Sequence, residues 1–189
     1  MKIIIVRHGE TKEGKKGIIL GQLPGNLSVQ GKLEVKKIAL AIKKSDLNPS
    51  LIISSDLKRT KETAKIISKK LNLPIVYERL IRERHVGIAQ GKKEDQIDWE
   101  IYEKKPFLQR KHKGGESFLI LQKRAKKFFS KMKKCDKDVI VISHSAFILM
   151  LISVIYKIPF QELIKYKNKT FFVEIKKGRL RLKPSFMKI

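Results

Sequence analysis

Short β-branched runs alternate with helical patterns along most of this chain, and this alternation limits the fold more than any other feature of the sequence. A run such as Ile3-Ile4-Ile5-Val6 has the length and residue types of a buried strand. The expected strands cover residues 2–6, 51–53, 73–77 and 138–142, and the expected helices cover residues 29–44, 56–71, 116–132 and 143–156. Strands that alternate with helices form a mostly parallel sheet. We therefore predict an α/β fold, a three-layer sandwich with helices on both faces of the sheet.

Two further segments complete the expected architecture. Residues 170–175 and 180–182 have the pattern of a terminal hairpin, and residues 78–115 are irregular and look like a small inserted cap segment. Within that segment we expect His85 and His112 to face solvent. A length of 189 residues corresponds to about one domain, so we expect residues 1–189 to form a single domain.

Capping residues and apolar stripes predict how the first two helices are placed. Ser28 has the character of an N-cap residue, and Val29 and Leu33 begin an apolar stripe that we expect to face the core. The pair Ser54-Ser55 precedes the second helix, and we expect it to cap that helix.

The chain is strongly basic, with 44 Lys and Arg against 18 Asp and Glu, a formal net charge of +26. Such a surface attracts anions, including nucleic acids and phosphorylated small molecules. The lysines are spread through nearly every segment, and stacking aromatic residues interleaved with arginine are absent. We therefore expect a small phosphorylated partner and no specific nucleic-acid partner, with the lysines on solvated helix faces.

The remaining composition predicts a cytoplasmic protein without a membrane segment. Apolar runs are far shorter than a membrane-spanning helix requires, and the first one is interrupted by Arg7 too early for a signal peptide. The one cysteine, Cys135, cannot form an internal disulfide bond. The sequence leaves the oligomeric state open.

Reactive side chains follow three of the expected strands. Arg7-His8-Gly9 follows the first strand, Ser54-Ser55 and Arg59 follow the second, and Ser143-His144-Ser145 follow the fourth. Ligands of parallel sheets bind beyond the carboxyl ends of the strands, so these groups can meet in one site. Two histidines, two arginines and several hydroxyl groups suit a compact anion such as a phosphoryl group. A metal is disfavoured because two guanidinium groups would repel the cation, so we expect no metal and no cofactor.

A neutral imidazole is a competent nucleophile at phosphorus, which makes covalent catalysis by His8 a specific hypothesis. Gly9 would let the backbone approach the ligand. The leaving oxygen must receive a proton, and the carboxyl groups of the 78–115 segment, notably Glu83, are the candidates for this step.

Six short segments, in order along the chain, resemble the motifs of the histidine phosphatase superfamily, the phosphoglycerate mutase-like proteins. An Arg-His-Gly triplet alone is weak evidence, but an ordered set of six is specific. The segments are Arg7-His8-Gly9-Glu10-Thr11, Gly21-Gln22 with the stretch up to Gly31, the stretch from Ser54-Ser55 through Arg59 to Ala64, Glu83-Arg84 with Gly87 and Gly91, Gly115-Glu116-Ser117, and Ser143-His144-Ser145.

This resemblance implies a role for each matching residue. His8 would be the nucleophile that becomes phosphorylated, Glu83 would be the proton donor and then the base, and the phosphoryl oxygens would be bound by Arg7, Arg59 and His144. The substrate-binding residues implied on the same basis are Gly9, Thr11, Gly21, Gln22, Arg84 and Ser145, with Arg84 a candidate for a second anionic group.

Three functions stay open at this point. The leading one is a metal-independent phosphomonoester hydrolase that acts on a small phosphorylated metabolite through phosphohistidine. The first alternative is a phosphoglycerate mutase with the same chemistry, favoured by Ala89-Gln90-Gly91 and disfavoured by the short stretch between Glu83 and Gly115. The second alternative is a non-catalytic module that binds nucleic acid or a phosphorylated ligand.

Overall fold

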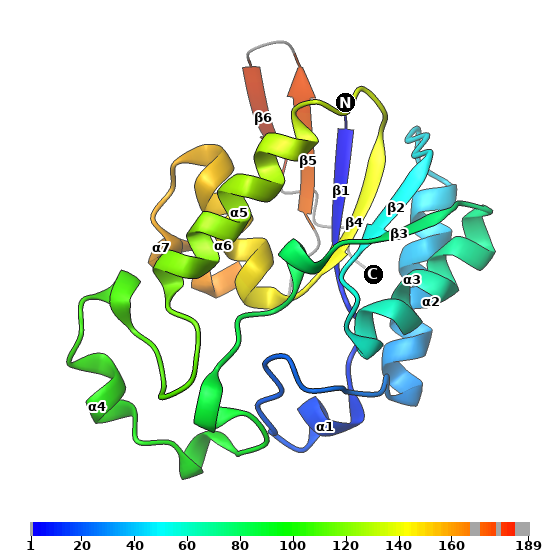
Figure 1. The fold of residues 1–189 in the computed structure, drawn as a ribbon. Helices are drawn as coiled ribbons and strands as arrows, with labels where there is room; N and C mark the ends of the chain where they lie inside the picture. Colours follow the sequence, from blue (N-terminus) through cyan, green and yellow to red (C-terminus); the bar gives the residue numbers. More distant parts are fainter. Residues whose placement is uncertain (1, 167–170, 177–178, 184–189) are drawn as a thin grey trace.

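The computed structural model describes residues 2–166, 171–176 and 179–183, and a six-stranded sheet forms its centre (Figure 1). Across the sheet the strands follow the order β3-β2-β4-β1-β5-β6. Strands β1 to β4 pair in parallel, and β5 and β6 extend the sheet in antiparallel pairing. The strand bounds are β1 (Lys2–Arg7), β2 (Leu51–Ser54), β3 (Ile75–Tyr77), β4 (Val139–Ser143), β5 (Phe171–Lys176) and β6 (Arg179–Lys183). The predicted mostly parallel sheet is confirmed, while residue 170 of the predicted hairpin lies outside the described residues.

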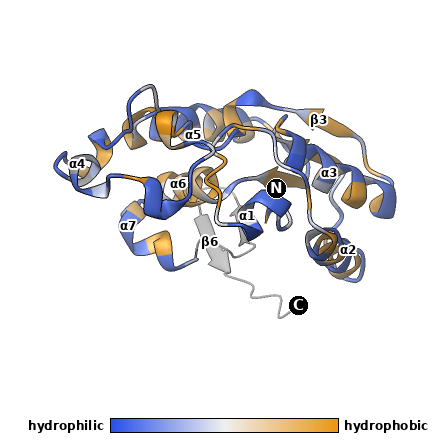
Figure 2. Cartoon of the chain, turned by 90° about the horizontal axis from the view of Figure 1, so that it is seen from below, coloured by the Kyte–Doolittle hydropathy of each residue, from blue (hydrophilic) through white to orange (hydrophobic). Residues whose placement is uncertain are grey.

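Helices cover both faces of this sheet, as Figure 1 shows. One face is covered by α2 (Val29–Lys43) and α3 (Lys58–Leu71), and the other by α5 (Phe118–Met132) and α6 (Ser145–Tyr156). The shorter helices are α1 (Lys12–Lys15), α4 (Trp99–Glu103) and α7 (Phe160–Leu163). In Figure 2, α3 and α5 carry both hydrophilic and hydrophobic residues, as expected of amphipathic helices that cover a sheet. No described helix has both the length and the apolar character needed to cross a membrane.

The strand β1 divides its side chains between two hydrophobic cores. Ile3 and Ile5 pack with the apolar residues of α5 and α6, whereas Ile4 and Val6 pack with those of α2 and α3. This division follows from the two-residue period of a strand, and it explains why the run is apolar at every position. The predicted three-layer sandwich is thereby confirmed.

The apolar stripe predicted for α2 is partly wrong. Ser28 is the N-cap residue, as expected, and its hydroxyl group accepts a hydrogen bond from the Gly31 amide. Val29 and Leu33, however, are 76% and 46% exposed. The buried face of α2 begins instead with Gly31 and Val35, because the absence of a side chain at Gly31 lets the helix approach the loop after β1.

The second helix, α3, begins later than predicted and is not capped by Ser54-Ser55. Its N-cap residue is Leu57, which has no side-chain oxygen that could accept a hydrogen bond from an amide of the first turn. Ser54 belongs to β2, and the Ser55 hydroxyl group lies 2.9 Å from a ring nitrogen of His144. Ser54 therefore ends the strand β2, and Ser55 lies beside His144.

Residues 78–115 lie beyond the carboxyl ends of β1 and β4, beside α1 (Figure 1). This stretch consists of short 3₁₀ turns and the single short helix α4. The prediction that His112 faces solvent is wrong, since it is 8% exposed. Its ring is stacked on Tyr102, with 4.5 Å between the ring centroids, and this contact packs the irregular stretch together.

Candidate active site

The two strand-end histidines meet because β1 and β4 are adjacent parallel strands. In their register Arg7 is opposite Ser143, and the His8 amide donates a hydrogen bond to the Ser143 carbonyl oxygen over 3.1 Å. The residue after each strand is therefore a histidine at the same edge, and the two ring centroids are 5.2 Å apart. The predicted convergence of His8 and His144 is confirmed in the structure.

Hydrogen bonds select one tautomer of the His8 ring. Its Nδ1 lies 2.8 Å from the carbonyl oxygen of Gly9, an atom that can only accept. The Nε group of Arg59, which can only donate, lies 3.1 Å from His8 Nε2. Both neighbours place the proton on Nδ1 and the lone pair on Nε2, so His8 presents a nucleophilic nitrogen.

The charge state of His8 favours the same role. Burial lowers the pKa of His8 well below 6.5, and the positive charges of Arg59 and Arg7 lower it further. The imidazole is therefore neutral at pH 7. A protonated ring would have no lone pair to offer to phosphorus.

Arg59 holds three groups from one buried position. Besides His8, its guanidinium donates to the carbonyl oxygens of Leu23, over 2.9 Å, and of Gly21, over 2.7 Å. Burial lowers the pKa of Arg59 to about 10, so the group stays charged at neutral pH. Because its Nε donates to the lone pair of His8, attack by this nitrogen requires Arg59 to exchange His8 for an oxygen of the incoming group.

His144 is fully buried at the start of α6. Its Nε2 lies 2.9 Å from the Ser55 hydroxyl group, and its Nδ1 has no hydrogen-bond partner among the described residues. Burial, followed by the charge of Arg59, lowers the pKa of His144 well below 6.5. Ser55, which the sequence analysis placed among the groups at the strand ends and also expected to cap a helix, is therefore a neighbour of His144.

The carboxylate of Glu83 lies at the N-terminal end of α6. One of its oxygens accepts a hydrogen bond from the Arg84 amide over 2.8 Å, and the other accepts from the Ala146 amide over 3.3 Å. Burial lowers the pKa values of Arg7 and Arg59, and the negative charge of Glu83 raises them by a smaller amount. The acid predicted from sequence therefore lies close to both arginines.

Three of the predicted substrate-binding residues contact or directly follow the central groups of the site. Gly21 has a φ of +51° and directs its carbonyl oxygen to Arg59. The side-chain amide of Gln22 donates to the carbonyl oxygen of Glu83 over 2.9 Å, and this bond links the two segments. Ser145 is the first residue of α6.

The other three predicted substrate-binding residues make packing or capping contacts in this structure. Gly9 lies against α2, where a Cβ atom would be 2.5 Å from the Gly31 carbonyl oxygen, so its small size serves packing. Thr11 is buried and caps α1. Arg84 is 8% exposed, and its guanidinium lies over the Phe118 ring at 4.2 Å from the centroid. Arg84 is therefore packed against the start of α5 in this structure.

Groups that could hold a metal ion are not assembled in the part of the chain that the structure describes. Among those residues, no three side chains of the His, Cys, Asp and Glu types come together as a ligand set. The positive site around His8 suits an anion.

Burial of two neutral histidines predicts a pH dependence of stability. Below pH 6.5 the unfolded chain protonates both imidazoles, whereas His8 and His144 stay neutral in the folded protein. The free energy of unfolding should therefore fall as the pH falls from 6.5, approaching about 1.4 kcal/mol per pH unit for each histidine. Urea unfolding between pH 7.5 and 5.5 measures this slope. The double variant His8→Asn, His144→Asn should have a flatter profile, and equal slopes would contradict the prediction.

A neutral histidine whose lone pair faces Arg59, at the carboxyl edge of an α/β sheet, is an arrangement that suits phosphoryl transfer. The chain belongs to the histidine phosphatase superfamily (branch 1), whose family model matches residues 3–179.

Individual relatives agree with this membership. A probable phosphatase of Schizosaccharomyces pombe is 34% identical over 161 residues, which cover 80% of this chain and 71% of the relative. A metal-independent phosphoserine phosphatase of Arabidopsis thaliana is 36% identical over 157 residues, covering 76% and 63%. The crystal structure of the alpha-ribazole phosphatase from Shigella flexneri superposes with a TM-score of 0.84 at 19% identity, covering 97% of this chain and 95% of that one, and it shows the shared fold.

Proposed function

We propose that this protein is a metal-independent phosphomonoester hydrolase that acts on a small phosphorylated metabolite through a phosphohistidine at His8. The observation that carries the proposal is the state of His8, whose Nε2 bears a lone pair while the ring is held neutral beside Arg59. A site that only binds phosphate needs donors and charge, but it has no need of a nucleophilic nitrogen.

In the first step, His8 Nε2 forms a bond to phosphorus while the bond from phosphorus to the leaving oxygen breaks. Arg7, Arg59 and His144 bind the three remaining oxygens and stabilise the charge that develops on them. Glu83, which takes up a proton before this step, gives it to the leaving oxygen, so the product is an alcohol and not an alkoxide.

In the second step, water clears the phosphoenzyme. Glu83, now a carboxylate, accepts a proton from the water molecule as its oxygen attacks phosphorus. The bond between phosphorus and His8 Nε2 breaks, inorganic phosphate leaves, and the neutral imidazole is restored. Protons and charges balance over the two steps without a cofactor.

The rest of the assignment concerns the surroundings of this site. We propose that residues 1–189 act as one domain and that residues 78–115 form a cap over the site, where Gln22 joins them to the 21–23 loop through the Glu83 carbonyl group. The phosphoserine phosphatase among the relatives favours a phosphorylated hydroxyl compound as substrate. The cytoplasmic location and the absence of a nucleic-acid partner stay predictions from composition.

Incubation with 3-phosphoglycerate and a trace of its bisphosphate tests hydrolysis against mutase activity. We expect inorganic phosphate to be released, with a chelator such as EDTA present, because no metal takes part in the proposed steps. A mutase must instead protect its phosphoenzyme from water while the product reorients. Rapid interconversion of the phosphoglycerates without release of phosphate would overturn the assignment as a hydrolase.

A further inference from the structure

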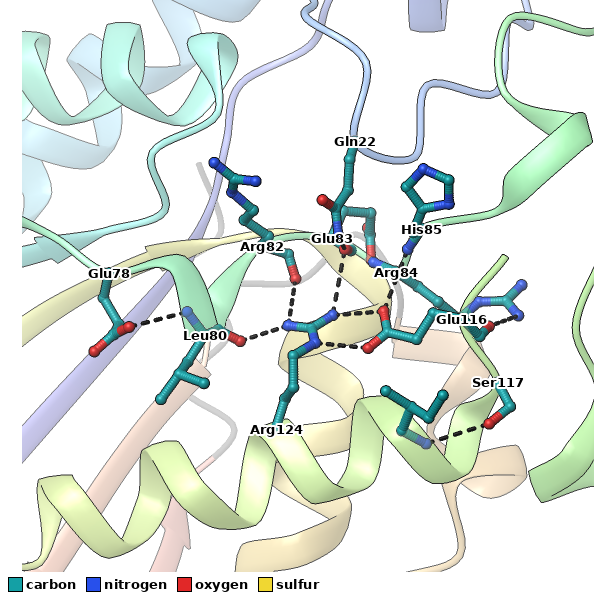
Figure 3. A network of polar contacts seen from close by, with 11 residues as sticks. Gln22, Glu78, Leu80, Arg82, Glu83, Arg84, His85, Glu116, Ser117 and Arg124 are labelled. Atoms are coloured by element: carbon teal, nitrogen blue, oxygen red, sulfur yellow. Dashed lines mark hydrogen bonds and ion pairs between the residues drawn. The ribbon is translucent and has the colours of Figure 1, made fainter. Parts of the chain in front are cut away.

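Every N–H group of the Arg124 guanidinium is used inside the protein, as Figure 3 shows. Two of the five hydrogen bonds go to the Glu116 carboxylate, over 2.6 and 2.7 Å. The other three go to backbone carbonyl oxygens, those of Leu80, Arg82 and Glu83. A guanidinium has five N–H donors, so none is left over.

The carbonyl groups that Arg124 binds belong to a stretch that departs from regular structure. A 3₁₀ turn ends at Ile81, and Arg82 after it is extended. Backbone carbonyl groups in such a stretch need partners that a helix or sheet would otherwise supply. Arg124 supplies partners from α5 to all three carbonyl groups, while Gln22 also donates to that of Glu83, and Arg124 thereby helps to set the path of the backbone at Glu83.

Glu116 holds the backbone on the C-terminal side of Glu83, at His85. Its Oε2 accepts a hydrogen bond from the His85 amide over 3.3 Å, and its own amide donates to the His85 carbonyl oxygen over 2.7 Å. The Arg124 and Glu116 side chains are 17% and 9% exposed. Burying a charge pair contributes little net stability, so fixing a geometry is the better-supported role of such a pair.

We infer that Arg124, held by Glu116, is the positioning residue for the proton donor Glu83, an inference that rests on the proposed function. The Glu83 carboxylate accepts a hydrogen bond from the Ala146 amide at the start of α6, two residues after His144. A backbone shift at Glu83 would therefore move the acid relative to the phosphoryl site. A misplacement of about 1 Å can lower a rate by about 100-fold.

Arg124→Lys tests this inference, because lysine keeps a positive charge beside Glu116 but offers three donors from a single point. The two probes are phenyl phosphate and p-nitrophenyl phosphate, which have similar shapes. Phenolate is a more basic leaving group than p-nitrophenolate, so hydrolysis of phenyl phosphate depends more on proton donation to the leaving oxygen. We expect kcat/KM for phenyl phosphate to fall by about 100-fold, and kcat/KM for p-nitrophenyl phosphate to fall by much less. Lys123→Met, on the exposed side of α5, is the matched control and should leave both values unchanged.

Glu83→Gln and the double variant Glu83→Gln, Arg124→Lys distinguish the role of Arg124 from the role of Glu83. If Arg124 acts through Glu83, Arg124→Lys should cause little further loss when Glu83 is already glutamine. Equal losses on both substrates, or losses that multiply in the double variant, would overturn the role of Arg124 and leave that of Glu83 intact. If Glu83→Gln itself lowers kcat/KM equally for both substrates, Glu83 is not the proton donor.

A variant that removes the whole charge pair keeps the inference testable if Arg124→Lys does not fold. Arg124→Met combined with Glu116→Leu leaves no buried charge unpaired. A folded double variant, verified by circular dichroism, should show the same preferential loss on phenyl phosphate. Wild-type selectivity between the two substrates in this variant would overturn the inference.

Discussion

Replacing His8 with alanine is expected to lower kcat for p-nitrophenyl phosphate by at least about 10⁴-fold, since removal of a catalytic nucleophile has effects of this order or larger. The arginines and His144 would still bind phosphate, but no nitrogen would be left to form the covalent intermediate. The folded state should persist, because removal of the His8 ring relieves the unfavourable burial of an imidazole near two arginines.

The phosphoenzyme itself gives a direct readout of the same variant. Acid-labile labelling with a phosphate ester, followed by mass spectrometry, should place one phosphoryl group on the wild-type chain and none on His8→Ala. The control is His85→Asn, which changes a histidine outside the proposed phosphoryl site and should still be labelled. Substantial hydrolysis by His8→Ala, or activity that requires an added divalent metal, would contradict the mechanism.

Replacing Gly31 with alanine should reverse the usual effect of this substitution in a helix. Alanine in place of a helical glycine normally stabilises a protein by about 1 kcal/mol. At Gly31, however, a Cβ atom would lie 2.1 Å from the Glu10 carbonyl oxygen and 2.7 Å from its amide nitrogen. These are backbone atoms, so no rotamer change can relieve the clash, and α2 must move away from the loop that follows His8. We expect a loss of about 3 kcal/mol or more in the free energy of unfolding.

Urea unfolding measures this loss, and kinetics show whether the loop moves with it. The neighbouring Gln30→Ala is the control, because Gln30 is exposed and its replacement should change stability by less than about 0.5 kcal/mol. We also expect kcat of Gly31→Ala to fall, since Gly9 and Glu10, which follow the nucleophile, are the residues displaced. A variant as stable as the wild type would show that the close approach of α2 is not needed.

The layered fold could be predicted because its signals are local. Strand β1 is apolar from Ile3 to Val6 because both of its faces are covered, and this pattern is visible without any tertiary contact. The stripe of α2 was misjudged for the opposite reason. Val29 and Leu33 are apolar but exposed, whereas Gly31 is buried because another loop lies against it. Hydrophobicity alone cannot show which side of a helix the rest of the chain occupies.

The candidate site also has parts that could be predicted from the sequence and parts that could not. His8 and His144 could be brought together from the sequence because each follows an expected strand, and parallel neighbouring strands end at one edge. Arg84 could not be placed, because its neighbour Phe118 lies on α5, far along the chain. Arg124 was missed as a contributor for the same reason, since the carbonyl groups that it binds are distant in sequence.

By itself, then, the sequence determined the alternation of strands and helices, the edge of the sheet where the chemistry lies, and the residue types available there. Only the tertiary structure decided which lone pair of His8 is available, what Arg59 holds, and how Arg124 fixes the backbone at Glu83. The physical reason is the distance along the chain over which each interaction acts. Periodicity and capping act between residues a few positions apart, whereas the protonation state of a ring and the position of a carboxylate depend on donors that reach the site from other parts of the chain.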